Sequence, residues 1–157
     1  MSSVSKGDAR AVADLSTGLI LASVEIAAPP ERVFAALSTA EVAEWWGSPD
    51  SYRVTKWTAD VRPGGSWCCD GVSANGEEFT VSGDILRVEP PNLLVQTWKY
   101  ADQTTPATTL QYRIDAIPGG SRVTVRHEGF TDMASCEAHA MGWERVLGWL
   151  ARYAAAH

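Results

Sequence analysis

The sequence predicts an α+β fold, in which a curved antiparallel sheet of about seven strands wraps around a long C-terminal helix, and two short helices follow the first strand. Three observations lead to this prediction. Short runs of alternating apolar and polar residues recur, turn residues separate them, and the last segment has apolar residues at spacings of three and four. A sheet bent around one amphipathic helix buries the apolar faces of all these elements.

The first strand and the two short helices are predicted over residues 18–47. The alternation in "LILASVEIAA" turns one side of a strand toward the core. The stretch "APPERVFAALST" opens with prolines, which a helix tolerates in its first turn, so a short helix follows. Ser38 and Glu41 have the spacing of a capping box. They predict a second short helix, which carries Trp45 and Trp46 to a Gly-Ser-Pro break.

About six further strands are predicted between this break and the last helix, because turn signals recur along the segment. These signals are "RPGG", "NG", "EPPN", "TTPA" and "PGG". The pair Asn75-Gly76 suits a two-residue type I′ hairpin, in which both central residues are left-handed. At Gly83 the apolar residues shift from odd positions to even ones such as Leu86, so we expect a β-bulge there.

The last segment, "SCEAHAMGWERVLGWLARYAA", predicts a long amphipathic helix. One side of it carries Cys136, Ala140, Trp143, Leu147 and Leu150. The N-terminal residues 1–18 lack the apolar core of a signal peptide, and we expect them to form a flexible tail. Residues 19–157 are predicted to form a single domain, because the sequence shows neither an internal repeat nor a second set of elements.

Composition and charge narrow the range of partners. The 157 residues carry a net charge of -6 and have a pI near 5.0, so we expect no binding to nucleic acid or to an anionic membrane. No apolar run approaches the roughly 18 residues that a membrane-spanning helix needs. Three cysteines, Cys68, Cys69 and Cys136, form no C-x-x-C pair. This pattern favours a reducing compartment, and hence the cytoplasm.

This order of elements resembles the START-like, helix-grip superfamily (SRPBCC). Within it, the chain resembles the bacterial family similar to the activator of heat-shock-protein-90 ATPase. The residues that carry the resemblance are "APPERVFAAL" (28–37), Trp45-Trp46, "DVRPGG" (60–65), "VEPPNLLVQTW" (88–98), "HEGF" (127–130) and "HAMGW" (139–143). The resemblance covers residues 19–155 and implies a START-like domain with a deep, mostly apolar cavity between the concave sheet and the C-terminal helix. It does not imply one chemistry, because members of the superfamily bind lipids and hormones, assist chaperones or cyclise polyketides.

Seven tryptophans are far more than a chain of this length ordinarily contains. An indole offers apolar surface and one N–H donor, so several of them around a cavity suit a flat, hydrophobic ligand. Adjacent helix residues point about 100° apart. We therefore expect one indole of the Trp45–Trp46 pair to pack on the sheet and the other, assigned to Trp46, to roof the cavity mouth. The expected apolar wall is Trp67, Phe79, Trp98 and Trp143. The alternative is that these side chains only fill a core.

The expected polar contacts lie on two strands and on the long helix. Gln96 and Tyr112 have the phase of the cavity side, although a shift of one residue would turn them outward. His127 and His139 also have inward phases. A histidine in apolar surroundings stays uncharged near neutral pH and can accept a proton, so His127 is the candidate catalytic residue. The alternative for His127 is a core histidine whose nitrogens are both hydrogen-bonded.

These features predict a protein that binds a small hydrophobic or aromatic molecule in an internal cavity, without a tightly bound cofactor. We expect no metal, because His127, His139 and Cys136 lack a compact ligand spacing. One alternative is a cavity-based enzyme, a cyclase or hydro-lyase, in which His127 moves a proton. A second is a chaperone-associated stress protein, as the family name suggests. The free edges of an antiparallel sheet also allow a homodimer.

Overall fold

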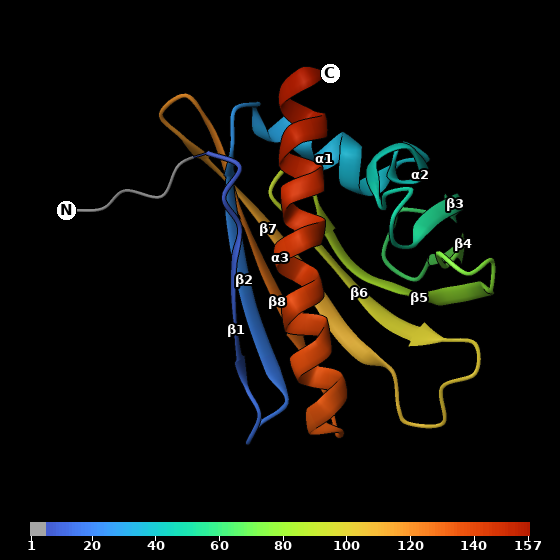
Figure 1. Ribbon diagram of the computed structural model, residues 1–157. Helices are drawn as coiled ribbons and strands as arrows, with labels where there is room; N and C mark the ends of the chain where they lie inside the picture. Colours follow the sequence, from blue (N-terminus) through green and yellow to red (C-terminus); the bar gives the residue numbers. More distant parts are fainter. Residues whose placement is uncertain (1–5) are drawn as a thin grey trace.

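The computed structural model describes residues 6–157 and contains the predicted sheet, curved around the long helix (Figure 1). The strands are β1 (Arg10–Asp14), β2 (Leu19–Ile26), β3 (Arg53–Ala59), β4 (Ser66–Val72), β5 (Glu78–Glu89), β6 (Leu93–Tyr100), β7 (Thr108–Ile117) and β8 (Gly120–Glu128). The helices are α1 (Pro30–Ser38), α2 (Val42–Trp45) and α3 (Met133–Ala156). This arrangement confirms the predicted fold class.

The sheet has the order β1-β2-β8-β7-β6-β5-β4-β3, and all its pairs are antiparallel. The strands from β3 to β8 form a meander, whereas β2 pairs with β8, the last strand of the chain. The α1–α2 segment connects β2 to β3 at the far edge of the sheet. In Figure 1 these short helices lie beside the C-terminal half of α3, and α2 contacts β3. They therefore cover a part of the sheet that α3 does not.

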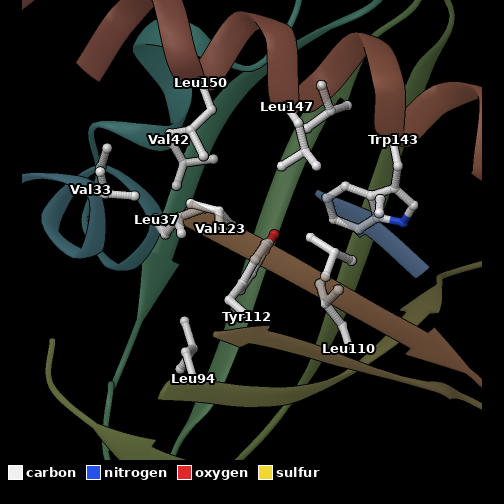
Figure 2. Packing of buried hydrophobic residues seen from close by; sticks show 14 of the residues in the cluster. Val33, Leu37, Val42, Leu94, Leu110, Tyr112, Val123, Trp143, Leu147 and Leu150 are labelled. Atoms are coloured by element: carbon white, nitrogen blue, oxygen red, sulfur yellow. The ribbon is translucent and has the colours of Figure 1, made fainter. Parts of the chain in front are cut away.

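Helix α3 begins where Asp132 caps it, since the Asp132 carboxylate accepts a hydrogen bond from the backbone N–H of Ala134 at 3.2 Å. The side predicted to be apolar is buried along its whole length. Its members Cys136, Ala140, Trp143, Leu147 and Leu150 are each at most 7% exposed. Figure 2 shows Leu147 and Leu150 pointing from α3 toward the sheet. In the described part of the chain, no helix is both long and apolar enough to cross a membrane.

The predicted flexible tail over residues 1–18 is corrected by β1. Residues Arg10–Asp14 pair with β2 and add an eighth strand to the sheet. Ala11 and Ala13 pack against the core from this strand. The sequence prediction missed it because alanine is a weak signal for strand and the segment is only 5 residues long. The first part of the predicted tail, residues 1–5, lies outside the described residues.

The predictions of a type I′ turn and of a capping box are also wrong. In the β4–β5 hairpin Gly76 is left-handed, with φ 88°, whereas Asn75 is not. The N–H of Gly76 donates to the Ser73 carbonyl at 2.9 Å. The connection is therefore a longer loop than a two-residue type I′ turn. The capping box is absent as well: the Ser38 hydroxyl donates to the Phe34 carbonyl, and no side chain caps α2.

The bulge expected at Gly83 lies further along β5. The pairing with β6 shifts between Ile85 and Arg87, which turns Leu86 outward, 50% exposed, and leaves Ile85 buried. Gly83 serves another purpose, because a Cβ there would lie 2.0 Å from the Thr97 carbonyl oxygen. Only glycine allows β6 to approach β5 so closely at this point.

Candidate functional site

A cavity lies between the short helices and strands β3 to β7. Its aromatic lining consists of Trp46, Tyr52, Trp57, Trp67, Phe79, Trp98 and Tyr112. The other lining residues are Leu37, Val42, Val54, Cys69, Val81 and Gln96. The volume of the cavity is only about 30 Å³, enough for about two water molecules. In this conformation the aromatic side chains therefore fill most of the space.

The two adjacent tryptophans have different surroundings, the core for Trp45 and the cavity for Trp46. Trp45 is 5% exposed, and its indole N–H donates to the Ala36 carbonyl of α1 at 2.9 Å. Trp46 follows α2, is only partly buried and lines the cavity. Its ring stacks on Trp98 with 5.9 Å between centroids, and its N–H donates to the Tyr52 hydroxyl at 3.2 Å. The indole also contacts the rings of Trp45 and Trp143, so one hydrogen bond and three ring contacts hold it in place.

Strands β4 to β6 supply the aromatic floor of the cavity. The Trp67 N–H donates to the Thr97 carbonyl at 2.8 Å, which fixes its ring 5.3 Å from that of Trp98. Phe79 lies across Gly71, where a Cβ would come within 2.2 Å of the phenyl ring. The Trp98 N–H is buried and has no hydrogen-bond partner within the described chain. A buried donor without a partner costs free energy, and native proteins contain few of them.

Gln96 and Tyr112 bring polar groups into this apolar lining. They are 4% and 3% exposed, and neither the amide nor the hydroxyl forms a hydrogen bond with any group of residues 6–157. Both residues line the cavity. Figure 2 shows the Tyr112 hydroxyl pointing from the sheet toward α3.

The cavity is electrically neutral near pH 7. No Asp, Glu, Lys, Arg or His side chain is among its lining residues. Burial raises the pKa of the Cys69 thiol to about 12 and also raises the pKa of the Tyr52 and Tyr112 hydroxyls. All three groups therefore keep their protons, and a ligand in this space would meet no formal charge.

His127 and Trp143, two of the predicted ligand contacts, bind one another in the closed core. The Trp143 N–H donates to Nδ1 of His127 at 3.1 Å, so Nε2 carries the histidine proton and lies 2.7 Å from the Thr108 hydroxyl. His127 is 0% exposed, and burial lowers its pKa to about 3. A neutral imidazole with both nitrogens occupied is a structural histidine. Neither residue lines the cavity, and these contacts do not support His127 as a general base.

His139 lies in a second hollow, between the β6–β7 loop and the start of α3, with a volume of about 240 Å³. Its Nδ1–H donates to the Ser135 carbonyl at 2.8 Å, and its Nε2 lies 3.4 Å from the Tyr100 hydroxyl. Burial lowers the pKa of His139. Trp98 lines both hollows, so its indole stands between His139 and the aromatic cavity.

The structure thus gathers five of the eight predicted ligand contacts around one cavity: Trp46, Trp67, Phe79, Trp98 and Tyr112. Sequence reasoning missed Trp57 and Tyr52. Trp57 shares the inner side of β3 with Val54, three positions away, because the pairing with β4 shifts between Val54 and Lys56. Simple alternation does not reveal such a pair. Tyr52 lies outside every regular element, so no periodicity pointed to it.

Among residues 6–157, no three His, Cys, Asp or Glu side chains lie close enough together to hold a metal ion. His127 and Cys136 are both completely buried, whereas His139 is partly exposed.

Solved structures from several bacteria have the same fold. Protein Ms6760 from Mycobacterium smegmatis is 21% identical, with a TM-score of 0.77 and 93% of each chain covered. A protein from Rhodobacter sphaeroides is 18% identical, with a TM-score of 0.80, and covers 96% of this chain and 99% of its own. The AHSA1 protein from Silicibacter pomeroyi is 27% identical, with a TM-score of 0.74, and covers 88% of this chain and 98% of its own. No curated protein matches the sequence.

The family assignment comes from a sequence model that matches residues 27–155, nearly the whole described domain. This range includes α1, α2, every cavity-lining residue and most of α3. The model is that of the activator of Hsp90 ATPase homolog 1-like proteins, and the chain belongs to this family.

Proposed function

We propose that this protein binds a small, flat, hydrophobic or aromatic molecule in the cavity between the short helices and the sheet. The observation that carries the proposal is the lining, in which seven aromatic side chains converge on one space without a formal charge among them. A hydrophobic core needs no such concentration of indoles. Flat rings gain from stacking on aromatic side chains as well as from leaving water.

Binding requires the cavity to enlarge, because the present space has room for only about two water molecules. Trp46 is the side chain best placed to move. It is partly exposed and follows the last residue of α2. Its indole makes one hydrogen bond, to Tyr52, and also contacts the rings of Trp98 and Trp143. Gly47, the next residue, has φ 130°, a conformation that favours glycine and lets the chain turn sharply after the indole. We infer that Trp46 swings outward and that the ligand ring takes its place against Trp98.

The contacts of His127 favour ligand binding over catalysis in this chain. His127, the candidate general base, donates to or accepts from core groups at both nitrogens. The three cysteines are free, which supports the cytoplasm as the place where the protein works.

Intrinsic tryptophan fluorescence, titrated with flat hydrophobic compounds, tests this function. We expect saturable quenching in the native protein, because four of its seven tryptophans line the cavity: Trp46, Trp57, Trp67 and Trp98. Trp46→Phe should remove a large share of the quenching and change the affinity. Trp149→Phe is the matched control, since Trp149 packs on Tyr52 from α3 but does not line the cavity.

The absence of saturable quenching across the panel would count against a ligand cavity. Equal loss of quenching in Trp46→Phe and Trp149→Phe would place the binding elsewhere on the molecule.

A further inference from the structure

Besides Trp98, whose N–H is unpartnered, the cavity lining holds two polar side chains for which residues 6–157 provide no partner. Gln96 and Tyr112 are almost completely buried, and neither forms a hydrogen bond within residues 6–157. Native proteins rarely leave a buried amide or hydroxyl unpaired, because burial removes its bonds to water. Something that enters the cavity, either water or part of a ligand, must therefore supply the missing bonds.

The two side chains are placed to act on the same group. Gln96 on β6 is paired with Leu110, and Tyr112, two residues further along β7, is paired with Leu94. They are diagonal neighbours on the concave side of the sheet, a relation that lets long side chains reach a common point. Tyr112 directs its hydroxyl into the layer between sheet and α3, as Figure 2 shows. Both residues line the same small space.

We propose that the ligand is a neutral aromatic molecule with an oxygen substituent, a phenolic hydroxyl or a carbonyl, which Gln96 and Tyr112 recognise together. This inference rests on the proposed function and names the chemical class that the cavity selects. A phenol accepts a hydrogen bond from the Tyr112 hydroxyl and donates to the Gln96 amide oxygen. A carbonyl accepts from the hydroxyl and from the amide NH₂.

The same lining rejects an anion such as a carboxylate. An anion would lose its water in a cavity whose lining offers no cation to compensate. The guanidinium of Arg145 is close by, but it lies against the Tyr52 ring at 5.5 Å from the centroid and is not part of the lining. We therefore expect the cavity to select a ligand that is uncharged and carries a polar group.

Three naphthalene derivatives of similar size test this inference: naphthol, methylnaphthalene and naphthoate. Each is titrated into ¹⁵N-labelled protein, and the indole N–H signals of the tryptophans report binding in the cavity. We expect naphthol to bind about tenfold more tightly than methylnaphthalene, as one good hydrogen bond would give, and naphthoate to bind most weakly.

Two variants and one control show which residues make the distinction. Gln96→Leu and Tyr112→Phe keep the size of each side chain, and both should reduce the preference for naphthol while methylnaphthalene binds as before. Gln111→Leu is the matched control. Gln111 precedes Tyr112 on β7 and therefore faces the opposite side of the sheet, so this variant should keep the full preference.

The outcomes separate the two proposals. If methylnaphthalene binds as tightly as naphthol, or if the preference survives in both cavity variants, the polar pair only holds water and the inference is overturned. Preferential binding of naphthoate would also overturn it, while leaving the ligand cavity intact. If none of the three compounds moves the indole signals, the proposed function itself fails, and the inference fails with it.

Discussion

His127 makes the stability of the folded state depend on pH, because its imidazole is completely buried. Its folded pKa, about 3, is depressed from the ordinary value of 6.5. Below about pH 6.5 the unfolded chain therefore binds a proton that the folded chain refuses, and stability falls as the pH falls. Burial lowers the pKa of His139 as well, so this residue adds to the loss.

We expect the free energy of unfolding to fall by about 2 kcal/mol between pH 7 and pH 5 because of His127 alone. Urea denaturation at several pH values measures this loss. In His127→Gln, whose amide can still bond to Trp143 and Thr108, more than half of the pH dependence should disappear. His157→Gln, a change at the exposed C-terminal residue, should leave the dependence as it is. An unchanged slope in His127→Gln would contradict the buried, neutral histidine.

Removing the Trp143 N–H from the core and removing the Tyr112 hydroxyl from the cavity should have different effects on the free energy of unfolding. Trp143→Phe leaves Nδ1 of His127 without its donor and should cost about 1–3 kcal/mol or more, since an indole is also trimmed. Tyr112→Phe removes a hydroxyl that has no protein partner, so the free energy of unfolding should stay the same or rise. Thermal and urea denaturation of both variants test this contrast. A clear destabilisation by Tyr112→Phe would reveal a structural hydrogen bond at that hydroxyl.

At the scale of elements, a polar cluster fastens α2 to its neighbours at the end away from Trp46. Arg32 of α1 pairs with Glu41, and the Tyr153 hydroxyl of α3 donates to the same carboxylate at 2.6 Å. The hydrogen bond from Arg32, which has the largest effect, and the one from Tyr153 lower the pKa of Glu41 to about 2. The start of α2 is therefore fixed to α3, whereas the only side-chain hydrogen bond of the Trp46 indole at the other end of α2 goes to Tyr52.

We expect Tyr153→Phe to lower the free energy of unfolding by about 1 kcal/mol, the usual net value of one hydrogen bond or slightly more for a charged acceptor. Glu41→Gln should weaken the same cluster. Because the two groups bond to each other, the double variant should cost less than the sum of the single changes. Strictly additive losses in a double-mutant cycle would show that the cluster does not act as a unit.

The elements were largely predictable from the sequence, because each depends on a local pattern. The periodicity of α3 and the alternation along β2, β7 and β8 were sufficient to place them. The bulge in β5 was not, since the apolar side chain of Leu86 suggested an inward position, whereas the pairing with β6 turns it outward. A single inserted residue changes which side chains face the core, and only the neighbouring strand decides where it occurs.

At the scale of the whole molecule, the cavity follows from the way three elements meet. The concave sheet, α3 and the α1–α2 segment surround one core (Figure 1), and aromatic side chains pack within it. The sequence indicated which residues face this layer, and five of eight predicted contacts line the cavity. It did not indicate that Trp143 and His127 bond to each other and withdraw from the lining. Such pairings between strand and helix depend on packing that no single element determines.

The same packing explains why the volume of the cavity could not be predicted. Seven aromatic residues surround a space of only about 30 Å³. A lining this rich suits a ligand larger than the present space, so we expect the molecule to have a second, open conformation. In it, Trp46 leaves its stack on Trp98, while the fixed cluster around Glu41 keeps α2 in place.

A crystal structure of the protein bound to naphthol tests this central claim most directly. We expect the naphthol ring to lie against Trp98 in the place of the Trp46 indole, with its oxygen between Gln96 and Tyr112, and the hydrogen bond from Trp46 to Tyr52 to be broken. A naphthol molecule seated outside this cavity, with the Trp46–Trp98 stack still at about its present 5.9 Å, would contradict a gated aromatic site.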